Sequence, residues 1–213
     1  MKKYDILNQL QKNYLVAVVR GKQFDETIQI IEAVLEGGIS NIEITYTTPR
    51  ASELISHFRD RTDLCVGAGT VMTAHNADEA IRNGAAYVVS PHFDAEISKI
   101  CNLYHIPYLP GCGSVTEVTE AFKSGVDVVK LFPGGVLGAS FIKDVKGPIP
   151  HANVMPSGGV SKDNIGDWIK NGAFAVGIGS ALTKGFDGTD TGVITDNTKS
   201  FVNAYKNAIK GGN

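Results

Sequence analysis

A lysine inside an otherwise apolar segment is the residue of this sequence best suited to chemistry. Lys130 lies in the run Asp127-Val-Val-Lys-Leu-Phe132, and the period-two alternation of a strand places Val128, Lys130 and Phe132 on one face. If that face is turned inward, burial disfavours the charged ammonium and favours the neutral amine that attacks a carbonyl. The alternatives are a lysine whose head reaches solvent at a strand end, or one held in a structural ion pair.

A carboxylate occupies the equivalent place in another β-branched segment. Glu43 lies in Asn41-Ile-Glu-Ile-Thr45, with Thr45 on the same face. A carboxylate beside an amine can assist carbinolamine formation and dehydration, and can take a proton from a substrate hydroxyl as a carbon–carbon bond breaks. The alternative is a structural salt bridge that only neutralises Lys130. Such a pair can still become an acid–base pair once substrate binds.

Two glycine-containing segments have the composition of phosphate-binding turns. Ser157-Gly158-Gly159 and Gly179-Ser180 each follow an expected strand, at the place where phosphate-binding barrels hold their anion. Glycine lets backbone N–H groups approach phosphate oxygens closely, and a helix beginning at Ser161 would add positive potential. Tight turns need glycine in any case, so the two turns together, rather than either alone, predict a phosphate site.

Other residues at expected strand ends could complete a pocket. Arg20 ends the first expected strand and could hold a carboxylate or phosphate through its bidentate fork, or lie solvated at the rim. Thr70 and Pro91 could shape the pocket and Phe132 could line it with apolar surface, although each also suits ordinary core filling. Cys112 has no histidine in its local sequence and is interpreted as structural.

These residues need a frame that brings strand ends together, and eight short β-rich segments separated by helical patterns supply it. The expected strands are Leu15–Val19, Asn41–Thr45, Leu64–Ala68, Ala86–Ser90, Pro107–Leu109, Asp127–Phe132, Asn153–Met155 and Phe174–Ile178. Alternating strands and helices favour a parallel sheet covered by helices. The sequence therefore predicts one domain over residues 1–213, an α/β (β/α)₈ TIM barrel, with a doubly wound open sheet as the alternative.

The expected helices have clear ends. In the helix over residues 25–36, Ile28, Ile31 and Leu35 share one face and Gly37-Gly38 stops the helix. An extra N-terminal helix, Lys2–Lys12, is expected to plug or flank the bottom of the barrel. Lys184–Ser200 has the composition of a loop leading to a last helix, Phe201–Ile209.

Composition excludes several classes of function. The net charge of -2 gives no broad positive field for nucleic acid or anionic lipid, and the apolar runs are too short for a membrane span or signal peptide. Three cysteines without paired spacing argue against disulfides and structural zinc, and the five histidines lack the spacing of a helical metal site. We expect a cytoplasmic protein that uses no metal and no organic cofactor.

Seven segments, in order along nearly the whole chain, resemble the 2-keto-3-deoxy-6-phosphogluconate (KDPG) aldolase family, which includes 4-hydroxy-2-oxoglutarate (KHG) aldolases. They are Glu43-Ile-Thr45, Val66-Gly-Ala-Gly-Thr70, Val89-Ser-Pro-His92, Pro110-Gly111, Val129-Lys-Leu-Phe-Pro133, Met155-Pro-Ser-Gly-Gly159 and Gly177-Ile-Gly-Ser-Ala181. The fifth and sixth segments at this separation are specific as a set, though each is weak alone.

The resemblance implies a class I aldolase, a homotrimer of barrels, that cleaves KDPG to pyruvate and glyceraldehyde 3-phosphate or KHG to pyruvate and glyoxylate. Lys130 would then form the Schiff base and Glu43 would be the general acid and base. The pyruvate end would be lined by Thr70, Pro91 and Phe132, and Thr45 would also bind substrate. The distal phosphate would be surrounded by Ser157, Gly158, Gly159, Gly179 and Ser180.

One position departs from the family pattern. Several members carry an arginine two residues after the threonine of the second strand, where it grips the substrate carboxylate, whereas this chain has Thr47. We expect Arg20 to replace that arginine. Arg50 is the weaker candidate, because Pro49 is expected to start a helix and turn Arg50 outward.

Two other functions remain compatible with the residues. A phosphate-binding barrel isomerase or decarboxylase could use Lys130 and Glu43 as acid and base without an imine. A barrel that only binds a sugar phosphate would leave both charged residues without a purpose. In each case the ligand is a small 2-keto acid or a phosphorylated sugar, with no nucleic acid or membrane partner.

Overall fold

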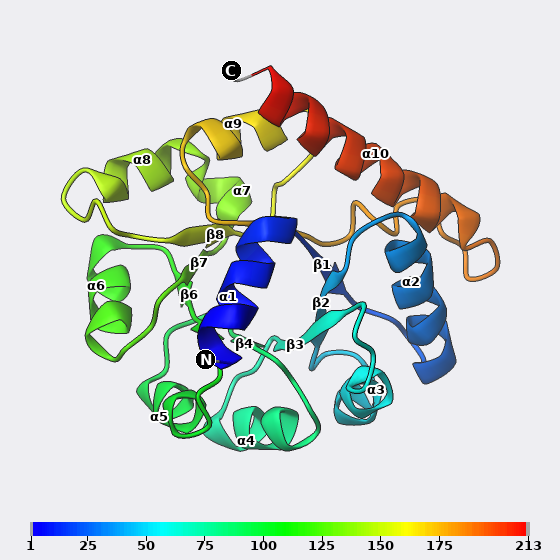
Figure 1. Ribbon diagram of the computed structural model, residues 1–213, viewed down its shortest axis with the longest axis horizontal. Helices are drawn as coiled ribbons and strands as arrows, with labels where there is room; N and C mark the ends of the chain where they lie inside the picture. The colour runs from blue at the N-terminus through cyan, green and yellow to red at the C-terminus, as the bar shows by residue number, and fades with distance from the viewer. Residues whose placement is uncertain (1, 212–213) are drawn as a thin grey trace.

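Short parallel strands alternate with helices throughout the computed structural model, which describes residues 2–211 (Figure 1). The strands in this range are β1 (Leu15–Val19), β2 (Asn41–Thr45), β3 (Cys65–Gly69), β4 (Val88–Val89), β5 (Tyr108–Leu109), β6 (Gly111–Cys112), β7 (Val129–Leu131), β8 (Val154–Pro156) and β9 (Val176–Ile178). The helices are α1 (Lys2–Asn13), α2 (Phe24–Glu36), α3 (Ala51–Phe58), α4 (Ala74–Arg82), α5 (Ala95–Leu103), α6 (Val115–Lys123), α7 (Gly134–Leu137), α8 (Ser140–Lys146), α9 (Ile165–Lys170) and α10 (Gly192–Lys210).

The strands form a curled parallel sheet with helices around its outside (Figure 1). Six strands pair in the order β5-β4-β3-β2-β1-β9, and three more pair in the order β6-β7-β8. Only Pro110 separates β5 from β6. A parallel bridge between Ser157 and Gly177 links the end of β8 to β9. The predicted α/β class with a parallel sheet is therefore confirmed.

Strand alternation divides the core into two clusters. Residues such as Ile42, Ile44 and Ala68 face the outer helices in the larger cluster. The smaller cluster fills the inside of the curled sheet, where inward side chains of the strands meet α1. Its strand members include Val16, Leu109 and Met155, all buried. The interior is thus a packed apolar core at the end that α1 covers.

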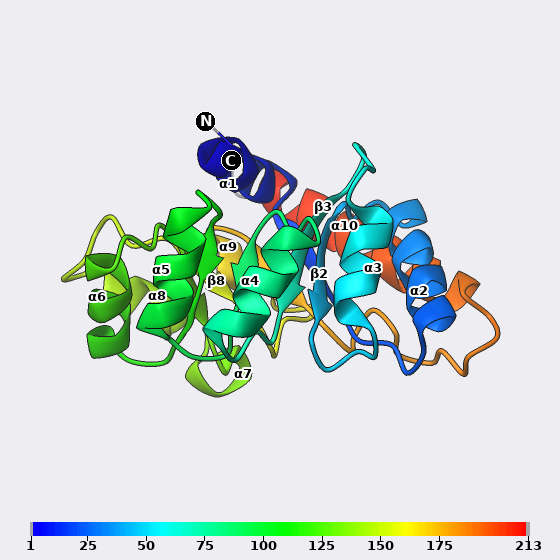
Figure 2. The ribbon, with the colours of Figure 1, turned by 90° about the horizontal axis from the view of Figure 1, so that it is seen from below.

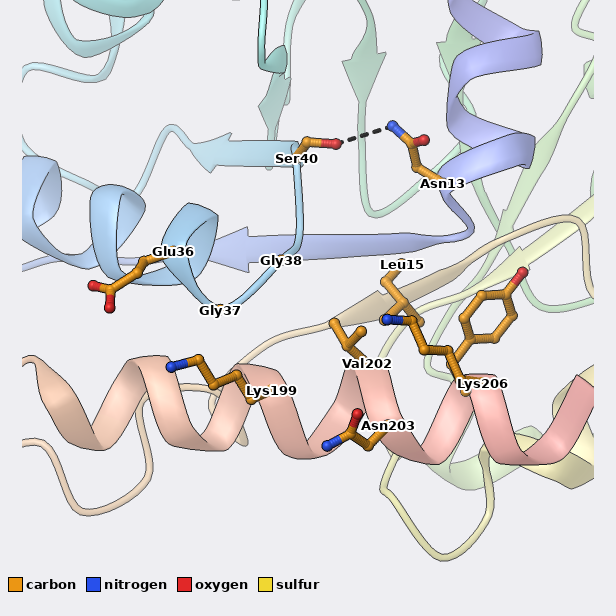
Figure 3. Close-up of a pocket in the computed structure, with 11 residues that line it drawn as sticks. Asn13, Leu15, Glu36, Gly37, Gly38, Ser40, Lys199, Val202, Asn203 and Lys206 are labelled. Atoms are coloured by element: carbon orange, nitrogen blue, oxygen red, sulfur yellow. Dashed lines mark hydrogen bonds between the residues drawn. The ribbon is translucent and has the colours of Figure 1, made fainter.

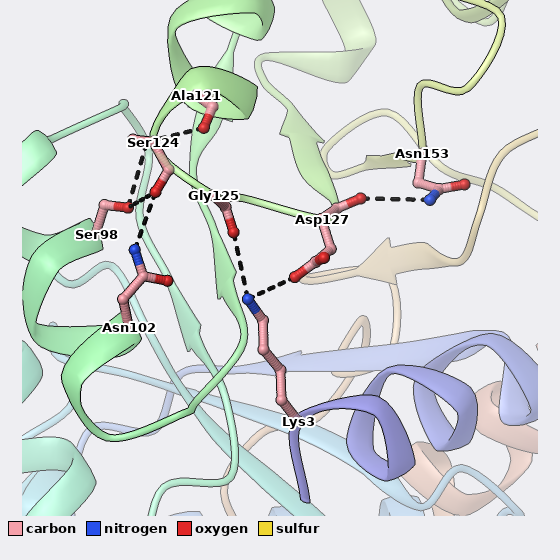
Figure 4. Close-up of polar contacts among 8 residues, drawn as sticks. All are labelled: Lys3, Ser98, Asn102, Ala121, Ser124, Gly125, Asp127 and Asn153. Carbon is pink, nitrogen blue, oxygen red and sulfur yellow. Dashed lines mark hydrogen bonds and ion pairs between the residues drawn. The ribbon is translucent and has the colours of Figure 1, made fainter. Parts of the chain in front are cut away.

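Helix α1 closes one end of the sheet, and α7 lies at the opposite end (Figure 2). Three buried residues of α1, Ile6, Leu7 and Leu10, belong to the interior cluster. Lys3 fastens the start of the helix, because its Nζ lies 2.6 Å from Asp127 Oδ2 and donates to the carbonyl oxygen of Gly125 at 3.3 Å (Figure 4). The first expected helix thus lies where it can plug the interior.

The strand boundaries agree with expectation at β1 and β2, and the six later strands each begin one or two residues late. The residues just before them already form backbone hydrogen bonds, but outside the regular ladder. Ala86 N–H donates to Val66 O and Phe174 N–H donates to Val154 O, both at 2.8 Å. The β-rich composition therefore marks the paired segments correctly but places the start of each of these regular strands too early.

Three expectations about helices and loops are wrong. The segment Lys184–Ser200 is not all loop, because α10 begins at Gly192 and continues without a break through the expected last helix. Its threonines suit a buried helix face, since the hydroxyls of Thr195 and Thr198 donate to the carbonyl oxygens of Ala33 and Ile194. The polar composition of this segment therefore conceals a helix whose hydroxyl groups have partners.

Two helices begin later than expected. Helix α9 begins at Ile165 rather than at Ser161, because Ser161 and Asn164 exchange hydrogen bonds in the turn before the helix. Helix α3 begins at Ala51 rather than at Pro49, and Arg50 has a left-handed φ of 58° at its N-cap. The positive potential expected from a helix starting at Ser161 is therefore displaced by one turn.

Candidate active site

The two charged residues predicted from the sequence lie together inside the sheet. Lys130 is 4% exposed and Glu43 is 0% exposed, and Lys130 Nζ lies 3.7 Å from Glu43 Oε1. They come from β7 and β2, which are not neighbours in either sheet, so the pair meets across the interior. The backbone of Lys130 is fixed by its N–H donating to Pro110 O at 2.8 Å. An amine and a carboxylate in a water-poor interior can perform carbonyl chemistry with proton transfer.

Glycine on β3 makes room for this pair. A Cβ atom at Gly69 would lie 2.2 Å from Glu43 Oε1, so any side chain there would displace the carboxylate. At Gly67 a Cβ atom would lie 2.4 Å from the ring of Tyr87, which fills the interior on the side of α1. The alternating glycines of Cys65–Gly69 therefore make room for side chains in the interior, a role that their sequence pattern does not indicate.

Phe132 lies beside the amine at the open end of the interior. Its ring centroid is 5.2 Å from Lys130 Nζ, within range of a cation–π contact. The side chain is 37% exposed, unlike the buried residues beneath it. Phe132 thus presents its ring beside Lys130 where the interior meets solvent, and its role as a wall of the substrate pocket stays a prediction.

The residues predicted for an anion site line a single cavity of about 170 Å³. Its lining consists of Val18, Arg20, Phe132, Ser157, Gly158, Gly159, Val160, Gly177, Gly179, Ser180 and Ala181. Gly158 and Gly159 have φ angles of 85° and 74°, which side-chain-bearing residues rarely adopt. A Cβ atom at Gly159 would lie 2.4 Å from Gly135 Cα, so the turn packs directly on the first turn of α7. The two glycine turns predicted from the sequence therefore meet in space.

Three further predicted residues lie at the strand ends around the charged pair. Thr45 is fully buried and its hydroxyl donates to Val19 O at 3.2 Å. Thr70 follows β3 with a left-handed φ of 55°. The backbone of Pro91 packs against Gly111, which pairs with Lys130 in the ladder between β6 and β7. Thr45, Thr70 and Pro91 thus lie at the mouth, the end of the sheet where the strands finish.

The arginine candidates lie in different surroundings. Arg20 lines the glycine cavity, and its Nη1 would lie 3.7 Å from a Cβ atom at Gly179. Arg50 is exposed, forms an ion pair with Glu53 at 2.6 Å and covers the ring of Phe24. Thr47 shares a hydrogen bond of 2.9 Å with the hydroxyl of Thr45. Of the two arginines, Arg20 is the one that faces the cavity.

The cysteines are buried free thiols. Burial raises the pKa of Cys112 to about 12, and Glu117 adds to the shift. Cys65 and Cys101 have pKa values raised to about 12 by burial as well. A thiol with such a pKa supplies almost no thiolate near neutral pH, which agrees with the structural interpretation of Cys112.

A larger groove lies at the other end of the sheet, where the strands begin (Figure 3). Its volume is about 500 Å³, and it runs between the α2–β2 turn and α10. Gly37 and Ser40 line one side and Lys199 and Lys206 the other. It contains none of the residues predicted for chemistry, so the charged pair and the glycine turns define the candidate site.

Sequence comparisons match this chain to a protein family and to individual enzymes. Residues 6–195 match the family described as KDPG and KHG aldolase. The 2-dehydro-3-deoxy-6-phosphogalactonate aldolase of Escherichia coli is 30% identical over 92% of this chain and 96% of its own length. The 2-dehydro-3-deoxy-phosphogluconate aldolase of Treponema pallidum is 31% identical over 77% of this chain and 79% of its own.

A solved structure shows the same fold with a reaction intermediate. The KDPG aldolase of Legionella pneumophila, with pyruvate captured as a covalent carbinolamine, superposes with a TM-score of 0.81 at 26% identity. The alignment covers 88% of this chain and 93% of that one. Among the helices over residues 2–211, none combines the length and the apolar composition of a membrane span.

The family match spans residues 6–195, which is nearly the whole chain. The chain therefore belongs to the KDPG and KHG aldolase family of lyases.

Proposed function

We propose that this protein is a class I aldolase that cleaves a phosphorylated 2-keto-3-deoxy sugar acid, or KHG, to release pyruvate. The observation that carries the proposal is the buried pair, with Lys130 Nζ 3.7 Å from Glu43 Oε1. The two relatives named above act on phosphorylated six-carbon keto acids, and the glycine cavity offers an anion site close to the pair. The isomerase or decarboxylase alternative is not favoured, because the family consists of aldolases.

In the proposed reaction the neutral amine of Lys130 adds to the C2 ketone of the substrate. Glu43 assists the loss of water from the carbinolamine, which leaves an iminium. Removal of the proton from the C4 hydroxyl then breaks the C3–C4 bond, and the bonding electrons enter the iminium to give an enamine and an aldehyde. Protonation of the enamine at C3 and hydrolysis release pyruvate and restore the amine.

The surrounding residues divide between the two ends of the substrate. Thr45, Thr70, Pro91 and Phe132 would contact the pyruvate half beside Lys130. Backbone N–H groups of Gly158, Gly159 and Gly179, with the hydroxyls of Ser157 and Ser180, would hold the distal phosphate, and Arg20 would add a positive charge. The sequence predicts that Arg20 holds the substrate carboxylate, but its position in the glycine cavity favours the phosphate instead.

We further propose that residues 1–213 form one domain, an eight-position (β/α)₈ barrel. In this interpretation β5 and β6 are one barrel strand interrupted by Pro110, which lacks an N–H donor. The Ser157–Gly177 bridge would then close the ring between β8 and β9. A homotrimer is the assembly that the family resemblance implies, and light scattering on the purified protein would test it. The short apolar runs support a cytoplasmic location.

Borohydride reduction in the presence of pyruvate tests the proposed chemistry. An imine-forming enzyme should lose activity and carry the mass of the reduced pyruvyl group on Lys130. Retro-aldol turnover on the phosphorylated gluconate and galactonate acids and on KHG, with pyruvate release as the readout, would identify the substrate. An enzyme that keeps its activity and its mass after reduction uses no imine, which would contradict the proposal.

A further inference from the structure

A buried tyrosine that the proposed mechanism does not use lies beside its carboxylate. Tyr87 precedes β4, is 0% exposed, and its hydroxyl has no hydrogen-bond partner among the described residues. Both carboxylate oxygens of Glu43 also lack a hydrogen bond in this range, since the amine of Lys130 is 3.7 Å away. Buried polar atoms usually have partners, so two unpaired groups in one interior suggest a relation between them.

Strand register brings these two groups to the same level of the interior. Glu43 is the ladder partner of Gly67, and a Cβ atom at Gly67 would lie 2.5 Å from Cζ of Tyr87, the ring carbon that bears the hydroxyl. Two residues along the same face of β3, a Cβ atom at Gly69 would lie 2.2 Å from Glu43 Oε1. The hydroxyl and the carboxylate thus lie over neighbouring glycines of one strand.

We propose that Tyr87 is a positioning residue for Glu43, whose carboxylate receives a hydrogen bond from the Tyr87 hydroxyl, directly or through one water molecule. The bond holds the carboxylate toward Lys130. Gly67 and Gly69 are required for the arrangement, because a side chain at either would occupy the place of the ring or of the carboxylate. The inference rests on the proposed function, in which Glu43 transfers protons.

The groups around the carboxylate are consistent with a permanent donor. Lys130 on β7 and Tyr87 lie near the carboxylate, Cys65 on β3 lies near Tyr87, and Arg20 after β1 lines the cavity of the glycine turns. Burial raises the pKa of Tyr87 well above its ordinary value, and Cys65 and Glu43 add to the shift. The Tyr87 hydroxyl therefore keeps its proton across the working pH range and can donate throughout it.

The Tyr87→Phe variant, which keeps the ring and removes only the hydroxyl, tests this role. Loss of the donor should leave the carboxylate free to turn away from Lys130, so the proton transfers of Glu43 should slow. We expect kcat to fall about tenfold, while KM should change little. Turnover is normalised to the folded fraction measured by circular dichroism, so reduced stability cannot imitate the loss.

Tyr14→Phe is the matched control. Tyr14 is 8% exposed, its hydroxyl is also unpaired within the described residues, and its ring stacks on Tyr205 at the opposite end of the sheet. Its kcat and KM should match those of the wild type. An unchanged kcat per folded molecule in Tyr87→Phe, with borohydride still trapping pyruvate on Lys130, would overturn the positioning role alone. A wild-type enzyme that forms no adduct would overturn the proposed function, and this inference with it.

Discussion

The two ends of the sheet interior are built from the same strands but from opposite kinds of residue. At the end covered by α1, Leu10, Val16 and Leu109 pack without any charged group. At the other end the same curled sheet holds Glu43 and Lys130, both almost fully buried. Apolar burial stabilises the fold, whereas burying a charged pair is costly unless geometry and hydrogen bonds compensate. The difference indicates that the α1 end stabilises the fold, whereas the buried charges at the mouth lower the free energy of unfolding and supply the reactive groups.

Of the changes considered, Lys130→Met should have the largest effect on the mouth end. The variant keeps the length of the side chain and removes the amine, so turnover should fall by at least about 10⁴-fold and borohydride should trap nothing. Glu43 would be left buried without its counter-charge, at a cost of about 3 to 5 kcal/mol in the free energy of unfolding. Pyruvate release and urea unfolding measure the two effects.

Two comparisons make the result specific. Lys123→Met, at an exposed lysine paired with Glu120 on α6, should change neither turnover nor stability appreciably. Adding Glu43→Gln to Lys130→Met should restore part of the lost stability, because a neutral amide replaces the unpaired carboxylate. If Lys130→Met kept measurable imine formation, the amine would have to come from another residue.

Glu43→Gln should have the next largest effect. The amide cannot exchange protons, so kcat should fall by about 10²- to 10⁴-fold, while slow formation of the borohydride adduct should persist. Glu36→Gln, at an exposed glutamate beside the groove at the other end, is the control and should leave kcat unchanged. A Glu43→Gln enzyme with normal kcat would show that the pair is only an ion pair.

Leu10→Ala tests the opposite end. Leu10 is 0% exposed within the interior cluster, and truncation should lower the free energy of unfolding by about 2 to 5 kcal/mol through the cavity that it leaves. The turnover of the folded fraction should be unchanged. Leu103→Ala, at a leucine that is 71% exposed, should cost little. A drop in kcat per folded molecule would show that the two ends are coupled.

The sequence predicted the positions of the residues at the mouth more accurately than the bounds of the helices and strands around it. Lys130 and Glu43 stood out because a charge in an apolar strand has few structural uses, and the glycine turns could be placed from their position after strands. Tyr87 did not stand out, because a tyrosine is an ordinary strand residue until the register places it over Gly67 and beside Glu43. The start of α10 was missed because composition does not show that Thr198 bonds within its own helix.

Arg20→Ala should have the smallest effect of the four changes. It distinguishes the phosphate cavity from the pyruvate half of the mouth. A charge-assisted hydrogen bond contributes about 1.5 to 3 kcal/mol, so its loss should raise KM for a phosphorylated substrate by about 10- to 100-fold and leave kcat and stability nearly unchanged. Because Arg20 lines the cavity of the glycine turns, the loss should be greater for the phosphorylated substrate than for pyruvate. A larger loss for pyruvate would instead assign Arg20 to the carboxylate. Arg50→Ala, at the exposed arginine paired with Glu53, should alter neither affinity, and equal affinities in Arg20→Ala and wild type would remove Arg20 from the site.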